Sequence, residues 1–235
     1  MEQKNITADL SNYISKMLRD NFGKGPENVY VSIGLNYITF YLKNFLSPTE
    51  KVLMQKDKEN TVQETRDTVM SNLIPQIQGY IKVVTGMEIN YFFYDWGLHN
   101  RSGMMVGLSS DETQTNFPVN ENYKGKEQLE EEIVEISKEA QKTPENIYSC
   151  QLNPRTILII RNGILVRIEK EIIRMGFQEH LRIAKRKLEK QLLHNNTLFN
   201  KILETKVSDV FVDWDFDVDK SVILLIMNPN KPHNP

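Results

Sequence analysis

The sequence has little cysteine and no long apolar run. Its single cysteine, Cys150, cannot form a disulfide within the chain, and this scarcity is typical of proteins from a reducing cytoplasm. The most apolar stretches, "TILII" and "SVILLIM", are far shorter than the roughly 20 residues that a membrane-spanning helix needs. The segment "MEQKNITADL" places no apolar run behind its charges, so we expect no signal peptide. These absences favour a soluble cytoplasmic protein.

Recognisable catalytic motifs are also missing. There is no G-x-S-x-G elbow, no Cys–His signature and no dinucleotide-binding fingerprint. The four histidines are scattered without the spacing of metal ligands. The formal net charge is only −2, so the chain as a whole is not suited to lie on a polyanion. We therefore predict a protein that is not an enzyme and that has no cofactor and no metal.

What the chain does contain is a repeat. The block "PENVY" at Pro26 returns as "PENIY" at Pro144, and 144 − 26 = 118. The two tryptophans, Trp96 and Trp214, follow the same spacing, because 214 − 96 is again 118. Matches at one fixed spacing indicate a tandem duplication.

Each half shows the same order of secondary-structure signals. A helical pattern is followed by two strands of alternating apolar residues, a long helix and two further strands. In "SPTE", Ser47 is a helix N-cap, Pro48 is the first helical residue and Glu50 completes a capping box. The segment "TVQE" from Thr61 repeats this start, and Gly86 lies just beyond the helix that it opens. The sequence predicts an α+β fold, a tandem repeat of α-β-β-α-β-β units. Each unit would be a four-stranded, mostly antiparallel sheet with helices on one face.

Boundaries follow from composition. The segment "SDETQTNFPVNENYKGK" is polar and contains one proline and one glycine, as expected of a linker between domains. The segment after the last strand, "NPNKPHNP", is polar and rich in proline. We predict a first unit at 1–109, a linker at 110–126, a divergent second unit at 127–228 and a disordered tail at 229–235.

Three blocks of the first half carry a family likeness. They are "FGKGPENVYV", "LSPTEKVL" followed by a helix that holds Arg66, and "TGMEINYFFYD", which ends at Asp95. These blocks resemble the MpsC-like family, formerly a bacterial domain of unknown function. The second half keeps Pro144, the hydrophobic pattern and Asp213 but lacks the glycine-rich entry and the Ser-Pro-Thr-Glu cap. The resemblance implies two tandem copies, of which the second is divergent.

The resemblance also implies a function by protein–protein binding. The family takes its name from a membrane-potential-generating system related to bacterial inorganic-carbon uptake. In such a system the chain would be an accessory or regulatory protein, either cytoplasmic or peripheral at the inner face of the membrane. Its partner would be a protein, such as a membrane transport complex. Because the members are mostly single units, the fused chain would be a monomer with pseudo-two-fold symmetry or a homodimer.

The first unit, which matches the family pattern better, supplies the candidate interaction surface. It consists of Lys24 in the glycine-rich entry, Glu50 and Lys51 in the capped turn, Arg66 in the following helix and Asp95 at a strand end. The resemblance assigns no catalytic role to these residues.

A second candidate is a basic patch in the segment "HLRIAKRKLEKQLLH". We expect Arg182, Lys185, Arg186 and Lys190 on the solvent side of a helix whose leucines face inward. Such a face would bind nucleic-acid phosphates, an acidic membrane surface or an acidic partner. The alternative is a solvated face that neighbours the acidic helix "EQLEEEIVE". Two further functions thus stay open: a nucleic-acid-binding regulator, and a sensor that holds a small anion or nucleotide between the two units.

Three other features have a functional and a structural interpretation. Gly23 would help to cradle an anion or would end a helix in the left-handed conformation, and the second interpretation is favoured. Asp95 and Asp213 would form a carboxylate pair or would each cap a turn. The run "DWDFDVD" is similar to a calcium loop but lacks the central glycine and the terminal glutamate. Cys150 lies within a strand, where a buried, inert thiol is expected.

Overall fold

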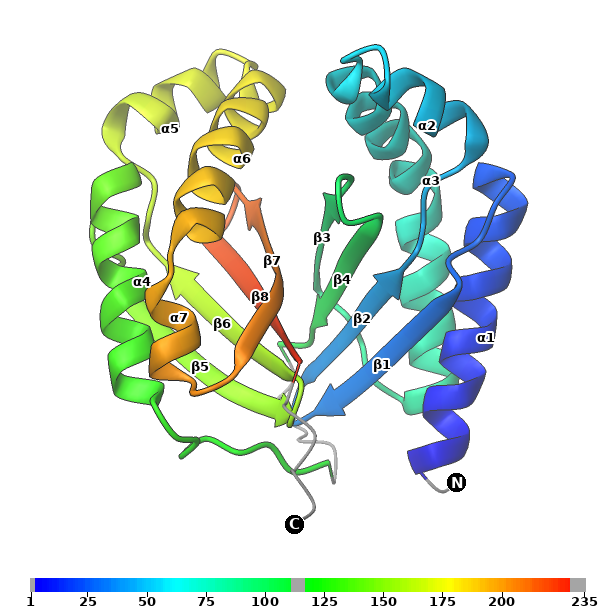
Figure 1. Cartoon of the computed structure of the whole chain (residues 1–235), viewed down its shortest axis with the longest axis horizontal. Coiled ribbons are helices and arrows are strands. Elements are labelled where there is room, and N and C mark those ends of the chain that lie inside the picture. The colour runs from blue at the N-terminus through cyan, green and yellow to red at the C-terminus, as the bar shows by residue number, and fades with distance from the viewer. Residues whose placement is uncertain (1–2, 111–116, 229–235) are drawn as a thin grey trace. The chain divides into compact units, whose positions relative to one another are not determined.

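The computed structural model describes residues 3–110 and 117–228, and these fall into two compact units. Unit 1 spans Met1–Pro118 and unit 2 spans Val119–Pro235. Each contains a four-stranded, wholly antiparallel sheet with helices (Figure 1), which confirms the predicted fold class and the tandem arrangement. The predicted tail at 229–235 lies outside the described residues.

Unit 1 is built from two β-hairpins and three helices. In chain order its elements are α1 (Gln3–Phe22), β1 (Asn28–Gly34), β2 (Tyr37–Lys43), α2 (Pro48–Met54), α3 (Glu59–Thr85), β3 (Tyr91–Gly97) and β4 (Ser102–Leu108). The strand order is β1-β2-β4-β3, so the second strand of each hairpin lies at the centre of the sheet.

Unit 2 repeats this arrangement with the order β5-β6-β8-β7. Its elements are α4 (Lys126–Ala140), β5 (Asn146–Asn153), β6 (Thr156–Asn162), α5 (Arg167–Arg174), α6 (Gln178–Asn195), α7 (Leu198–Ile202), β7 (Lys206–Asp215) and β8 (Lys220–Asn228). The predicted α-β-β-α-β-β scheme counts one helix between the hairpins, whereas the structure has two in unit 1, in line with the two predicted starts at Ser47 and Thr61, and three in unit 2. The short helices α2 and α5 each precede a long one.

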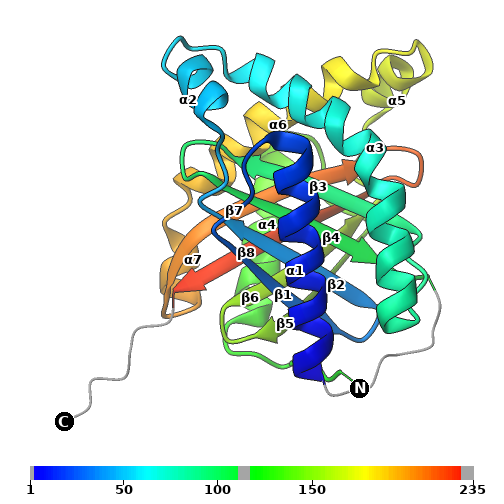
Figure 2. The same cartoon turned by 90° about the vertical axis from the view of Figure 1, so that its right-hand side faces the viewer.

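The core of each unit lies between the sheet and the helices. In unit 1, α1 and α3 lie across one face of the sheet, as Figure 2 shows, and bury their apolar stripes there. Strand residues of alternate position, such as Phe40, Leu42 and Trp96, join this core. The equivalent core of unit 2 includes Ile157, Ile159 and the side chains of α4. Along the described residues no helix combines the length and the apolar character needed to cross a bilayer.

The helix ends follow the sequence closely. Ser47 Oγ accepts a hydrogen bond from the Glu50 backbone N–H at 3.3 Å, and Glu50 Oε2 accepts one from the Ser47 N–H at 2.7 Å, so the predicted capping box is present. Gly86 ends α3 with φ 77°, and Gly23 follows α1 with φ 71°. Both angles lie in the left-handed region that glycine adopts without strain, as the helix-cap interpretation of Gly23 requires. The long helix α3 begins at Glu59, two residues before the predicted Thr61.

Part of the predicted linker packs against the units. The carbonyl of Phe117 accepts a hydrogen bond from the Leu35 N–H at 3.0 Å in unit 1. In unit 2, Asn120 forms an isolated bridge with Gln151, and Tyr123 is buried with its hydroxyl 2.6 Å from Ser149 Oγ. The predicted linker residues 111–116 lie outside the described part of the chain.

Candidate functional site

A buried ion pair joins α2 to α3 in unit 1. Arg66, whose side chain is fully buried, donates from Nε to Glu50 Oε1 at 2.7 Å and from Nη2 to Glu50 Oε2 at 2.9 Å. Nη2 also donates to the Phe45 carbonyl at 3.0 Å. Two parallel bonds from one guanidinium fix the orientation of both partners. The same carboxylate that closes the helix cap therefore also neutralises the arginine.

Aromatic rings surround this cation. The Arg66 guanidinium carbon lies 4.5 Å from the Phe45 ring centroid, 4.6 Å from that of Trp96 and 5.7 Å from that of Phe22. Ring faces attract cations, most strongly where water is excluded. Burial would raise the pKa of Glu50, but the hydrogen bonds and charge of Arg66 outweigh it, with Ser47 contributing, and the pKa is lowered. Glu50 is therefore a carboxylate at neutral pH.

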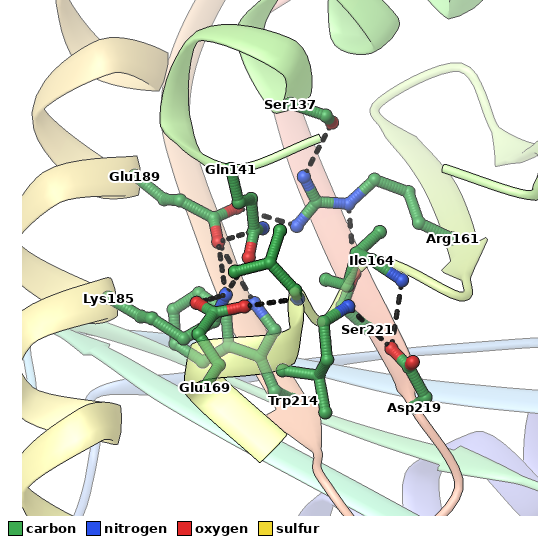
Figure 3. A network of polar contacts seen from close by, with 12 residues as sticks. Ser137, Gln141, Arg161, Ile164, Glu169, Lys185, Glu189, Trp214, Asp219 and Ser221 are labelled. Carbon is green, nitrogen blue, oxygen red and sulfur yellow. Dashed lines mark hydrogen bonds and ion pairs between the residues drawn. The ribbon is translucent and has the colours of Figure 1, made fainter. Parts of the chain in front are cut away.

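Unit 2 holds a larger network around Lys185 of α6 (Figure 3). The Lys185 ammonium lies 3.1 Å from Glu169 Oε1 and 3.4 Å from Glu189 Oε1, and it donates to the side-chain carbonyl of Gln141. It also lies 5.4 Å from the ring centroid of Trp214. The network thus connects the end of α4, the first turn of α5 and the middle of α6.

A second buried cation, Arg161 of β6, completes this network. Its Nη2 donates to Glu189 Oε2 at 2.7 Å, and its Nη1 and Nε donate to Ser137 Oγ at 2.8 Å and Ser221 Oγ at 2.9 Å (Figure 3). Arg161 and Glu189 are 0% and 1% exposed. Two cations and two carboxylates therefore neutralise one another inside unit 2.

The two networks have an equivalent pair at their centre. Glu169 corresponds to Glu50 and Lys185 to Arg66, since 169 − 50 and 185 − 66 both equal 119. In each unit the carboxylate and the cation are 16 residues apart in sequence, and the cation faces the single tryptophan of its unit. The spacing of 119 rather than 118 shows that copy two has one extra residue before α5.

Of the two networks, only the one in unit 2 contains a second ion pair, between Arg161 and Glu189. The equivalents of Arg161 and Glu189 are Leu42 and Met70, and both are buried. Leu42 pairs with Gly103 across the sheet as Arg161 pairs with Ser221, and 189 − 119 = 70. Ser221 corresponds to Gly103, where a Cβ atom would lie 2.6 Å from Trp96 Cε3. Trp96 of unit 1 thus occupies the space that a serine at position 103 would need.

The structure places the predicted interaction surface differently from expectation. Glu50, Arg66 and Asp95 are buried, and Asp95 Oδ1 accepts a hydrogen bond from the backbone N–H of Trp96 at 2.8 Å. Lys24 and Lys51 are partly exposed. The structure brings Glu50 and Arg66 together, but as a buried contact between α2 and α3 in which Glu50 also completes the helix cap. Of the predicted interaction surface, only Lys24 and Lys51 remain accessible.

The basic patch is also rearranged. Lys185 and Arg186 are buried, while Leu188 is 47% exposed, so the predicted inward and outward faces of this helix are partly reversed. The physical reason is that carboxylates of α5 and α6 receive Lys185 inside the unit. Arg182 Nη1 donates to Asp213 Oδ1 at 2.6 Å, and Lys190 is partly exposed. The alternative interpretation placed this helix beside the acidic helix, and α4 and α6 are indeed neighbours. However, Lys185 and Arg182 take their ion-pair partners from α5, α6 and β7 and not from α4.

The aspartate run after Trp214 forms a turn. Asp215 Oδ1 accepts from the N–H groups of Asp217 and Val218 at 3.0 and 3.4 Å. Asp219 Oδ1 accepts from the N–H groups of Ile164 and Leu165 at 2.8 and 2.9 Å (Figure 3). Across residues 3–110 and 117–228, no group of three or more His, Cys, Asp or Glu side chains is placed to hold a metal ion. Backbone hydrogen bonds in turns and loops therefore account for Asp215 and Asp219.

Cys150 is fully buried, and burial raises the pKa of its thiol to about 11. The thiolate, which is the nucleophile, is therefore scarce at neutral pH.

An open groove of about 450 Å³ lies between α4 and α6 in unit 2. Its walls carry Glu132, Glu135 and Glu139, and its apolar part includes Ile136 and Leu192. The excess of carboxylates opposes the binding of an anion or a nucleotide here.

The comparisons with known proteins agree with the internal repeat. A family model described as "Na+-translocating membrane potential-generating system (MpsC)" matches residues 2–110 and again residues 123–229. No curated protein and no solved structure gives a significant match.

Proposed function

The chain belongs to the MpsC family of the Na+-translocating membrane potential-generating system, and from this premise we propose that it is a non-catalytic binding component of such a system. Both copies match the family, so the whole folded part of the chain derives from this module. The partner would be a membrane transport complex, and inorganic-carbon uptake is the transport that such a potential would drive.

One observation carries the non-catalytic part of the proposal. Among the ionisable groups that the sequence singles out, Glu50, Arg66 and Lys185 are held in ion pairs inside the units, Glu50 with Arg66 and Lys185 with Glu169. A catalytic group needs a substrate within hydrogen-bond reach, and a pair sealed in a core does not offer that access. The geometry supports a module that presents its outer surface to partners.

The nucleic-acid alternative receives less support. Two of its four cations, Lys185 and Arg186, are buried, and a third, Arg182, is paired with Asp213. Phosphate binding needs exposed, unneutralised cations.

The test is the Na+-dependent membrane potential. Membrane vesicles from source cells with and without the gene would be compared with a voltage-sensitive dye, at equal total cation concentration with Na+ or K+. We expect the Na+-dependent part of the signal to fall without this chain and to return with the wild-type protein. An unchanged signal in the deletion strain would overturn the proposal.

A charge-reversal pair then tests the remaining candidate surface. The double variant Lys24→Glu, Lys51→Glu is expected to restore less of the Na+-dependent signal than the wild-type protein does, because these lysines stay accessible in unit 1. Lys4→Glu with Lys16→Glu makes the same charge change at exposed positions of α1 and serves as the matched control.

A further inference from the structure

The corner of unit 2 between α5 and α6 exposes large apolar side chains. Ile168 is 66% exposed, Met175 is 69% exposed and Phe177 is 46% exposed. Figure 1 shows this corner at the end of unit 2 opposite α7. Apolar residues that gather on a surface with such exposure mark sites of contact with a partner or a membrane.

The exposed residues follow one face of α5. Ile168, Ile172 and Met175 are spaced i, i+4 and i+7, which places them in one stripe along the helix. Ile172 is half-buried, and Met175 continues the helical backbone as the C-cap residue with φ −76° and ψ −1°. Gly176, with φ 83°, then turns the chain and brings Phe177 to the start of α6.

Helix α5 also exposes a stripe of cations. Arg167, Lys170 and Arg174 are all exposed and are spaced i, i+3 and i+7 on another face of the helix, with Glu171 between them and the apolar stripe. Arg174 pairs with Glu171 at 2.7 Å and Lys170 with Asp219 at 3.0 Å. The Arg174–Glu171 pair is exposed on both sides, and such a pair contributes little and is easily exchanged for other anions.

Unit 1 shows that the fold does not need apolar residues at this corner. Met175, Gly176 and Phe177 correspond to Lys56, Asp57 and Lys58, since 175 − 119 = 56. The backbone makes the same turn in both copies, with φ 54° at Asp57 and 83° at Gly176. The apolar side chains are therefore a feature that the second copy has and the first does not.

We propose that the α5–α6 corner of unit 2 inserts Ile168, Met175 and Phe177 into the headgroup–acyl boundary of an anionic bilayer, with Arg167, Lys170 and Arg174 on the lipid phosphates. A short amphipathic helix that exposes both an apolar stripe and a basic stripe is suited to this boundary. Anionic lipids attract the cations, and the apolar tips gain from leaving water. The inference rests on the proposed function, which brings the chain to a membrane, and it adds that the chain contacts lipid directly.

The test uses the purified full chain and protein-free vesicles. Co-sedimentation would be measured with vesicles of phosphatidylglycerol and phosphatidylethanolamine, and with vesicles of phosphatidylcholine alone. A Phe177→Trp variant reports insertion, because its new indole is exposed whereas Trp96 and Trp214 are buried. We expect binding to the anionic vesicles, weaker binding at high salt, and a blue shift of the new indole's emission on binding.

Two variants and a control assign the contact. Ile168→Ser, Met175→Ser and Phe177→Ser together should weaken binding at least about tenfold. Arg167→Glu with Arg174→Glu should abolish the preference for anionic lipid. Val52→Ser with Val83→Ser changes residues of unit 1 that are 56% and 82% exposed, and it should bind as the wild type does.

Each other outcome overturns the inference. Absence of binding to anionic vesicles does so, and so does binding that the triple serine variant retains. Binding only to source membranes, lost after trypsin treatment of those membranes, would identify the corner as a protein-docking site instead. None of these results depends on the Na+-dependent potential, so the lipid contact and the proposed function can fail separately.

Discussion

Trp214 donates its indole N–H to Glu189 Oε1 at 3.1 Å, so a strand residue and a helix residue of unit 2 share one buried contact. The same carboxylate also receives Arg161 at 2.7 Å and lies 3.4 Å from the Lys185 ammonium. One glutamate therefore joins β6, β7 and α6. In unit 1 its position is held by Met70, and the fold is the same.

Replacement of Glu189 by methionine, the residue of the first copy, should destabilise unit 2. The change leaves the fully buried Arg161 without its carboxylate, and the loss of one partner of a buried pair costs about 3–5 kcal/mol. The free energy of unfolding would be followed by hydrogen exchange of peptides from β6 and β8, which report on unit 2 alone.

The double variant Arg161→Leu with Glu189→Met should recover most of this loss. Both charges are then absent, and a buried ion pair contributes little beyond apolar residues of similar size. If the double variant is less stable than Glu189→Met alone, the pair is not the source of the effect.

The stability of unit 1 should fall in acid because of Glu50. The pKa of Glu50 is lower in the folded chain than its ordinary value of 4.5, so the unfolded chain binds the proton more readily. This contribution is complete above the unfolded-state pKa and is lost as the pH falls through the folded-state pKa. Urea midpoints measured from about pH 6 to about pH 3 should therefore decline more steeply for the wild type than for Glu50→Gln. Equal slopes would show that this carboxylate is not linked to folding.

Helix α5 should gain stability from a serine at its N-cap. Glu169 Oε2 already accepts from the Val166 N–H at 2.9 Å, but valine has no oxygen to accept in return. Val166→Ser supplies the acceptor that Ser47 provides in unit 1, for a gain of about 0.5–1 kcal/mol. Thermal unfolding of unit 2 would measure the gain. Val166→Ala, which shortens the side chain without adding an acceptor, is the control, and an equal shift in both variants would contradict the capping explanation.

Cys150 should resist thiol reagents in the folded chain. With a pKa of about 11, only about one thiol in a thousand is ionised near pH 8, and the side chain is fully buried. Labelling with N-ethylmaleimide, counted by mass spectrometry, should be negligible in buffer and complete in denaturant. Rapid labelling of the native protein would show that β5 opens readily.

Local signals explain what the sequence could predict. Ser47, Glu50 and Gly86 act through neighbouring backbone groups, so their pattern predicts the ends of α2 and α3 without knowledge of the tertiary structure. The alternation of apolar residues likewise predicts the hairpins. The repeat predicted that both halves share one fold.

The buried networks could not be predicted in the same way. Helical periodicity assigns a lysine to the solvent side, and only the approach of Glu169 from another helix makes a buried Lys185 acceptable. A signal was present in the sequence, because Glu and the cation are 16 residues apart in both copies. An ungapped alignment at a spacing of 118 hides it, since copy two has one more residue before α5.

The strand order has a consequence for how the chain folds during synthesis. The centre of the unit 1 sheet pairs Tyr37 with Leu108, and 108 − 37 = 71. The first hairpin and α1 are therefore made long before the strand that completes the sheet leaves the ribosome. Until then β2 has an unpaired edge, the kind of surface on which nascent chains associate wrongly. Unit 1 can close only when β4 has emerged, while unit 2 is still being translated.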